Sequence, residues 1–276
     1  MAMKKSFDEL TIADDYMFCT VMQDEELCKE LLSMILKNKV GKIVRLFKQK
    51  SIENQIASKG VRLDIMIEDD TGKLYDIEMQ TTDERNLPER MRYYQCAIDN
   101  SAINKGGDYN DLPDTFIIFF CTFDYPNRGH PVYTFKNFCE EDPDLLLPDG
   151  VTKVILNSAA AAKETNPELK ALLEYMNGIK GESGFIGELE SKIREVKEND
   201  ERRREYMIMT AFEADARRVA MLEGVRQGFS RGEAQGFSAG SHQKALETAK
   251  NLLALKLSIE NIAKATGLTE EEVEKL

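Results

Sequence analysis

Residues 61–80, VRLDIMIEDDTGKLYDIEMQ, contain two runs in which apolar and polar side chains alternate, one on either side of a turn. The runs cover residues 63–68 and 73–80, and their period of two predicts two β-strands. Between them, residues 69–72 have the composition of a turn, and Gly72 can adopt a positive φ at low cost. The stretch therefore predicts an antiparallel β-hairpin.

Three polar side chains on this hairpin are candidate ligands. Glu78 and Gln80 share one face because they are two residues apart, and Asp64 reaches that face if the register places it opposite about residue 78. Two carboxylates and an amide oxygen on rigid strands suit a hard divalent cation such as Mg²⁺. The alternative is that all three line a solvated face of the sheet, and alternation by itself favours this alternative.

The sequence around the hairpin predicts further helices and strands in mixed order. Helical spacing or apolar runs place helices at 24–36 and 88–104, and strands at 43–47, 115–122, 132–138 and 151–156. The run 115–122 is apolar on both faces, which suits the middle of a sheet. This order predicts an α/β fold with helices packed against a layered sheet.

Composition narrows the class of protein. The chain has 276 residues, 42% of them hydrophobic, and a formal net charge of −12, which favours a folded core over a disordered chain. No run of 18 apolar residues occurs, and the first nine residues do not read as a secretory signal, so we expect a cytoplasmic protein. Five scattered cysteines and two histidines argue against disulfide frameworks, zinc knuckles and Ser-His-Asp machinery, which leaves carboxylates to carry most of any catalysis.

The last third of the chain has a different pattern. Apolar residues at 186–196 follow a 3-4-3 spacing, typical of a coiled-coil seam or of a helix that packs one stripe on the body. Glycine then recurs at every fourth position: Gly224, Gly228, Gly232, Gly236 and Gly240. Five interior glycines cost a helix roughly 5 kcal/mol relative to alanine. The segment is therefore either a flexible linker or a helix packed closely against a partner.

Apolar stripes return in the last 36 residues, together with the capping-box pair Thr269 and Glu272. These features predict three short helices in a helix-turn-helix-like unit. Its final helix holds four glutamates and is therefore poorly suited to the major groove of DNA. We accordingly expect an α/β domain at 1–180, a helical connector at 181–240 and a small helical unit at 241–276, and we expect the C-terminal region to form a homo-oligomer, a dimer.

Several of these stretches together resemble the recombination-promoting nucleases, bacterial proteins of the PD-(D/E)XK superfamily that are often labelled transposases. The stretches are residues 10–31, 60–64, 75–80 and 90–94 and the glycine-spaced tail, so the resemblance spans nearly the whole chain. It implies a restriction-endonuclease-like core, a mixed sheet flanked by helices, with an α-helical C-terminal extension. It also implies a metal-dependent endonuclease that hydrolyses DNA with a metal-activated water. Mg²⁺ is the expected cofactor, with Mn²⁺ or Ca²⁺ as alternatives, and the expected role is in recombination or mobile elements.

The resemblance assigns roles to the hairpin residues. Asp64 matches the first aspartate of the superfamily, and Glu78 matches the acidic residue of its second motif. Gln80 stands where the superfamily usually has lysine. Glutamine can orient water or offer an amide oxygen, but it brings no positive charge. Asp76 is either a peripheral acid of the site or only an exposed residue, and we expect the latter.

Other polar residues are secondary candidates. An acidic residue on the first helix often completes such sites, and Glu26 and Glu30 lie there one turn apart. Candidates for contacts with DNA phosphates are found on the helix after the hairpin and in the basic stretch 37–50: Arg92, Gln95, Lys42 and Arg45. For each of them, a place on the solvated face of its element is the alternative.

The net charge of −12 opposes binding to anionic DNA unless basic residues cluster locally, so we expect weak binding that salt suppresses. A catalytically inactive relative that serves as a nucleic-acid-binding or protein-interaction module remains an alternative. Mg²⁺-dependent cleavage distinguishes the enzyme from this alternative.

Overall fold

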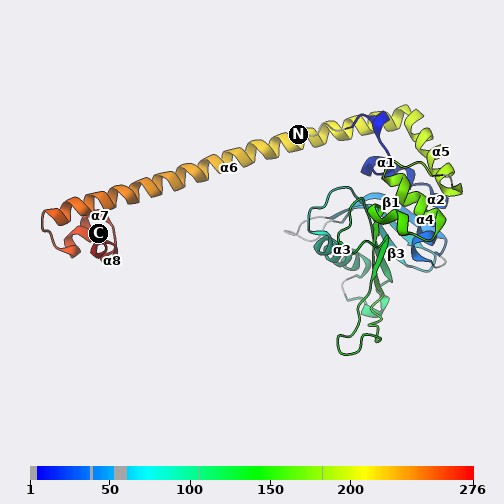
Figure 1. Ribbon diagram of the computed structural model, residues 1–276, viewed down its shortest axis with the longest axis horizontal. Helices are drawn as coiled ribbons and strands as arrows, with labels where there is room; N and C mark the ends of the chain where they lie inside the picture. Colours follow the sequence, from blue (N-terminus) through cyan, green and yellow to red (C-terminus); the bar gives the residue numbers. More distant parts are fainter. Residues whose placement is uncertain (1–4, 38–39, 53–60, 105, 182) are drawn as a thin grey trace. The chain divides into compact units, whose positions relative to one another are not determined.

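The computed structural model describes residues 5–37, 40–52, 61–104, 106–181 and 183–276. The chain divides into two compact units, Met1–Tyr206 and Met207–Leu276. The first unit contains the sheet and most of the helices (Figure 1). Among the described residues, no helix combines the length and the apolar character needed to cross a membrane.

The first unit is built on a six-stranded mixed sheet in the order β1-β2-β3-β4-β6-β5. The strands are β1 (Ile43–Ile52), β2 (Val61–Asp69), β3 (Leu74–Gln80), β4 (Thr115–Cys121), β5 (Val132–Phe135) and β6 (Val151–Asn157). The first three form an antiparallel meander, β3, β4 and β6 run parallel, and β5 pairs antiparallel with β6 at the edge. The predicted hairpin is confirmed, and Gly72 in its turn has a φ of 81°.

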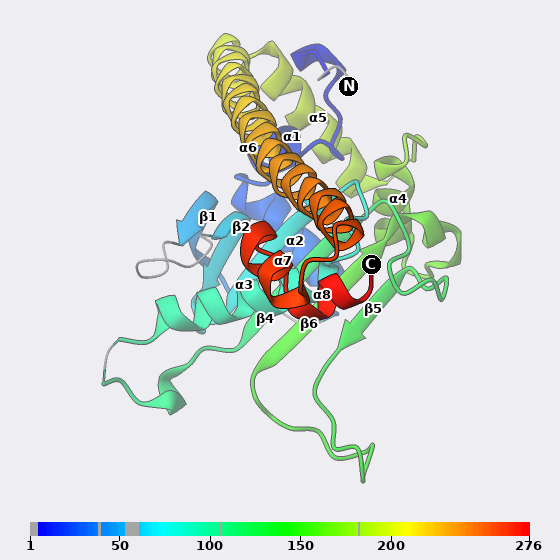
Figure 2. The same ribbon diagram turned by 90° about the vertical axis from the view of Figure 1, so that its left-hand side faces the viewer.

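Helices flank this sheet, as the sequence predicts. Those of the first unit are α1 (Asp15–Val21), α2 (Glu25–Leu36), α3 (Leu87–Ala102), α4 (Pro167–Met176) and α5 (Gly184–Glu198). Short 3₁₀ turns lie at Phe7–Glu9, Tyr109–Asp111 and Ser158–Lys163. The edge strand β5 ends at Phe135, earlier than the predicted residue 138. Figure 2 shows the loop between β5 and β6 leaving the sheet after this strand.

The two faces of the sheet are covered by different helices. Neighbouring residues of β4 point to opposite faces. Phe120 contacts Phe18 of α1, with ring centroids 5.6 Å apart, and Phe119 contacts Tyr94 of α3 at 6.0 Å. Both phenylalanines are fully buried, as expected for a strand in the middle of a sheet. Residues projecting from either face of the neighbouring strand β3 can therefore meet a helix.

The second unit contains most of α6 (Asp200–Ala254), followed by α7 (Ile259–Thr266) and α8 (Glu270–Glu274). A small core formed by Ala249, Ile262, Leu268 and Val273 joins these three helices. The predicted capping box at Thr269 is present. The glycine-spaced segment lies within α6, so it is a helix and not a linker. A Cβ added at any of its five glycines meets no atom within 4 Å.

The connection between the sheet and the glycine-spaced segment belongs to the first unit. Phe185, Leu189 and Ile193 of α5 are buried, which agrees with the alternative that this stripe belongs to a helix packed on the body. The beginning of α6 is also anchored in this unit, because Tyr206 packs against Phe7 and Tyr16. The boundary between the two units therefore lies at residue 206, beyond the limit of 180 that composition suggested.

Candidate metal centre

The register of the hairpin brings Asp64 next to Glu78. The backbone ladder between the two strands runs as far as the pair Ile65–Ile77, and Asp64 and Glu78 are the next residues beyond it. At this point side chains link the strands: the Asp64 backbone N–H donates to Glu78 Oε1 at 2.8 Å, and Asp64 Oδ2 accepts from the Met79 N–H at 3.2 Å. Each acid is therefore held by the backbone of the opposite strand.

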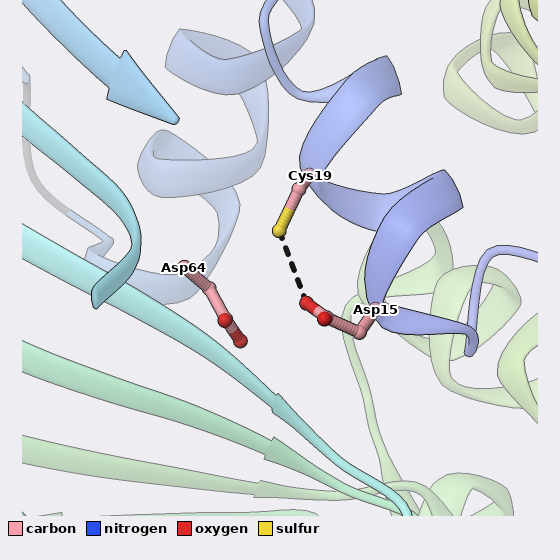
Figure 3. Close-up of side chains that lie close together, drawn as sticks. All are labelled: Asp15, Cys19 and Asp64. Atoms are coloured by element: carbon pink, nitrogen blue, oxygen red, sulfur yellow. Dashed lines mark hydrogen bonds between the residues drawn. The ribbon is translucent and has the colours of Figure 1, made fainter. Parts of the chain in front are cut away.

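The helix α1 places a second acidic side chain next to Asp64. Asp15 and Cys19 lie four residues apart on α1 and hence on one face of that helix. One ligand atom from each of Asp15, Cys19 and Asp64 lies within 4.8 Å of the other two, and this is the group of its kind found among the described residues. Figure 3 shows the side chain of Asp64 pointing from its strand toward α1. Glu78 is not a member of this group, and the contact that links it to the group is the hydrogen bond that it accepts from the Asp64 backbone N–H.

Burial and repulsion between like charges disfavour the ionised forms of these carboxylates. Burial raises the pKa of Asp64 to about 7, and the negative charge of Asp15 adds to the effect. Burial also raises the pKa of Glu78 well above its ordinary value, as do the charges of Asp76 and Asp64, whereas Arg90 opposes the rise. A nearby cation would favour the ionised forms of both acids.

Asp76 is not exposed, so that expectation was wrong. Its side chain is fully buried because it lies on the face of the sheet that α3 covers, where its pair partners Met66 and Ile117 share a hydrophobic core with Met91 and Ile98 of that helix. Neither carboxylate oxygen has a hydrogen-bond partner among the described residues. Burial raises the pKa of Asp76 well above its ordinary value, and Asp64 adds to this rise. An orphaned carboxyl beside two other acids indicates a place where positive charge is lacking.

These donors fit a hard divalent cation. Asp15, Asp64 and Glu78 offer carboxylate oxygens, which Mg²⁺ and Mn²⁺ prefer. Cys19 does not fit such an ion, because burial raises the pKa of its thiol and its Sγ donates to Asp15 Oδ1 at 3.2 Å. The thiol therefore acts here as a hydrogen-bond donor that positions Asp15.

Gln80 meets an arginine that the sequence did not single out. Nη1 of Arg90, on α3, donates to Gln80 Oε1, and Nη2 of the same guanidinium lies 3.5 Å from Glu78 Oε2. Gln80 is half-buried at the end of β3. Arg90 thus connects the two polar residues of β3 that the resemblance identifies. Its place in the segment 90–94, which carried part of the resemblance, was the available signal.

The acidic residue of the N-terminal helices that lies next to Asp64 is Asp15 of α1, and not Glu26 or Glu30 of α2. Glu26 is exposed on α2, and Glu30 lies on the same helix near Glu168 and Glu188. Burial, followed by these two like charges, raises the pKa of Glu30. Asp15 is the acid that reaches Asp64, and its place within the N-terminal part of the resemblance was the signal for it.

The candidate phosphate contacts are dispersed. Arg92 and Lys42 are exposed, and Arg45 pairs with Glu68 at 3.0 Å on the edge strand β1. Gln95 is buried and donates through Nε2 to Asp99 Oδ1 at 2.7 Å. Arg45 therefore lies exposed on β1 and Lys42 lies exposed just before this strand, whereas Gln95 is engaged within its own helix.

Comparison with known proteins gives one match. A family model described as PD-(D/E)XK nuclease family transposase matches residues 13–215. The matched stretch includes Asp15, the whole hairpin and α3. No curated protein and no solved structure matches the chain significantly.

Proposed function

The chain belongs to the PD-(D/E)XK nuclease family transposases, and on this premise we propose that it is a divalent-metal-dependent DNA endonuclease. The family relation indicates a nuclease linked to mobile elements. The proposal adds the chemistry, which is hydrolysis of a phosphodiester bond by water with Mg²⁺ as cofactor, and a role in DNA recombination or element transfer. The observation that supports it best is the meeting of Asp64 with Glu78 across the hairpin and with Asp15 from α1.

The side chains of this centre have distinct roles in the proposal. Asp64, Glu78 and Asp15 would hold the ion through carboxylate oxygens. When bound, a divalent cation lowers the pKa of a coordinated water and offsets charge on the phosphate. Gln80, one pleat from Glu78 on the same face, orients the attacking water through its amide. The thiol of Cys19 keeps Asp15 in place by its hydrogen bond.

DNA is the proposed substrate, and basic residues on β1 and just before it are its proposed contacts. Lys42, directly before β1, and Arg45 on β1 are exposed, and Lys50 lies further along the strand. A net charge of −12 opposes long-range attraction to DNA, so local contacts must supply the affinity. Binding should therefore weaken steeply as salt is added.

The proposal includes a homodimer formed through α6. An apolar residue follows three of the spaced glycines directly. Together with Met221, four residues earlier than the first of them, these residues form an apolar row on α6: Met221, Val225, Phe229 and Phe237. These four side chains are between 60% and 81% exposed. An apolar ridge beside a groove of glycines on one helix is self-complementary, because the ridge of one copy fits the groove of another. A second copy of the chain is therefore the partner that we propose, and it would bring two centres to the two strands of DNA.

Cleavage of supercoiled plasmid by the full-length protein tests the activity. We expect nicked or linear product with Mg²⁺ or Mn²⁺, no product with chelator, and no product from Asp64→Ala. Cleavage by Asp64→Ala at the wild-type rate would contradict the assignment of the centre. Binding of Mn²⁺ without any cleavage by the wild type would instead favour an inactive nucleic-acid-binding relative.

A further inference from the structure

Arg90 places a positive charge beside Glu78, one of the proposed ligands of the centre. It is in the first turns of α3, and its guanidinium lies over the end of β3 that carries Glu78 and Gln80. The lysine that the superfamily usually has at the position of Gln80 would bring a cation to this same end of the strand. Glutamine leaves that charge missing, and Arg90 supplies one from a neighbouring element.

The guanidinium is held firmly in this position. Nη1 donates to Gln80 Oε1, and Nη2 donates to the Tyr94 hydroxyl at 3.1 Å. The Arg90 Cζ atom also lies 5.5 Å from the ring centroids of both Tyr94 and Phe119. Contacts of this number fix a side chain that would otherwise be mobile, so little entropy is lost when it binds a ligand.

The environment of Arg90 leaves it able to bind an anion. Its side chain is 25% exposed, whereas that of Glu78 is 2% exposed, so the guanidinium forms the outer side of this ion pair. A guanidinium has five N–H donors, and the contacts with Gln80, Tyr94 and Glu78 engage at most three of them. Planar N–H groups that remain near solvent match the geometry of phosphate oxygens.

Gln80 and Arg90 are matched to each other. A lysine at position 80 would place an ammonium where the Gln80 amide oxygen now accepts from Arg90 Nη1, and two like charges would meet. The amide oxygen of glutamine instead accepts a hydrogen bond and directs the guanidinium. This pairing gives a physical reason for the departure from the usual lysine.

We propose that Arg90 is a catalytic residue that contacts the scissile phosphate and supplies the positive charge that Gln80 lacks, with Gln80 as its positioning residue. This inference rests on the proposed nuclease function. Arg90 stabilises the negative charge that develops on the phosphate oxygens as water attacks. No proton leaves Arg90, because its guanidinium stays protonated throughout.

The test compares Arg90→Gln with the double variant Arg90→Gln/Gln80→Lys in the full-length protein. Loss of a preorganised charge at the transition state should lower the plasmid-cleavage rate at saturating Mn²⁺ about 100-fold in Arg90→Gln. The double variant should recover much of that loss, because its ammonium returns a cation to the end of β3. Arg194→Gln, an exposed substitution of the same type on α5, is the matched control and should cleave like the wild type.

Mn²⁺ titration of each variant without DNA separates catalysis from a merely structural role. Arg90→Gln should bind Mn²⁺ at least as tightly as the wild type, because a competing cation beside Glu78 is gone. Thermal unfolding checks that each variant is folded. If Arg90→Gln unfolds, Arg90→Lys takes its place in the test. Because this variant keeps the charge, it should retain part of the wild-type activity.

Three results would overturn the inference: undiminished cleavage by Arg90→Gln, a parallel loss of Mn²⁺ affinity and cleavage, or a double variant no faster than Arg90→Gln. Absence of cleavage by the wild type in the same assay would reject the proposed function itself, and this inference with it.

Discussion

Asp64 has the most strongly constrained environment of the candidate ligands, because it meets both the opposite strand and α1. The energetic cost of this environment is visible in its pKa, which burial raises to about 7 from an ordinary value of 3.8. A carboxyl whose pKa is raised by folding binds protons more tightly in the folded state. Its contribution to stability is therefore present at low pH and is lost as the pH rises toward 7.

For Asp64→Asn we expect complete loss of cleavage together with higher stability of the metal-free protein at pH 8. The gain should be of the order of 2–4 kcal/mol at pH 8 and should fall as the pH approaches 4, and it vanishes only below the unfolded-state pKa of 3.8, where the wild-type carboxyl is protonated in both states. Urea unfolding at the two pH values measures it. A variant that is less stable than the wild type at both would show that the carboxylate is not strained in the folded state.

Substitutions of Asp15 and Glu26 distinguish which acidic residue near the N-terminus contributes to metal binding. Asp15→Asn should weaken Mn²⁺ binding about 10- to 100-fold, because it removes a carboxylate beside Asp64 while keeping the shape of the side chain. Glu26→Gln, on the exposed side of α2, should leave binding unchanged. Isothermal titration with Mn²⁺ compares the affinities of the two variants. A greater loss of affinity in Glu26→Gln than in Asp15→Asn would identify Glu26 as the third carboxylate ligand.

Among the structural elements, the β2–β3 turn determines how Asp64 and Glu78 meet. The buried carboxylate of Asp69 accepts hydrogen bonds from the Thr71 N–H at 2.9 Å, the Thr71 hydroxyl at 2.6 Å, the Lys73 N–H at 3.1 Å and the Tyr75 hydroxyl at 2.8 Å. Burial raises the pKa of Asp69, but these bonds outweigh it and the net shift is downward. The turn is thereby closed at one length, which fixes the register of the hairpin.

Asp69→Ala should destabilise the protein by about 2–4 kcal/mol, because it leaves several buried donors without an acceptor. The difference from the wild type should shrink below about pH 4, since a lowered pKa gives stability that is lost as the carboxylate is protonated. Asp70→Ala, in the same turn but exposed, is the control and should cost less than about 1 kcal/mol. Equal unfolding midpoints in urea for both variants would contradict this role of Asp69.

On the scale of the whole molecule, α6 contains residues of both compact units. Its first residues are anchored in the first unit: Arg203 pairs with Asp8 at 2.8 Å, and the Tyr206 hydroxyl donates to the Lys5 carbonyl at 2.9 Å. The glycine row lies in the second unit. A stable 55-residue helix with five glycines is unexpected in water without a partner, which is why we propose self-association there.

Replacing Gly228 and Gly232 by leucine in the full-length chain tests the proposed dimer. Leucine raises helix propensity by about 1 kcal/mol per site, so the helix should persist, whereas bulky side chains should hold two closely packed backbones apart. Light scattering should then report a dimer for the wild type and a monomer for the variant. Ser230→Leu, on the opposite side of α6, is the control and should remain dimeric. A monomeric wild type would reject this part of the proposal.

The sequence by itself determined the hairpin and the mixed sheet flanked by helices, whereas it gave the position of Asp64 opposite about residue 78 only as a condition on the register. These features depend on local signals: alternation with a period of two, turn composition at residues 69–72 and an apolar run that had to be buried on both faces. The same signals could not assign α5 to the first unit, because an amphipathic stripe records that a helix packs but not where.

Only the tertiary structure decided which side chains surround Asp64 and Glu78. Asp15 reaches Asp64 because α1 crosses one face of the sheet, and Arg90 reaches Gln80 because α3 covers the other. Asp76 is buried because α3 packs on the face of the sheet from which it projects, and the alternation of its neighbours in sequence does not show which helix covers that face. Alternation gives the direction of a side chain, whereas its partners come from segments far away in the chain, and those are fixed only when the elements pack together.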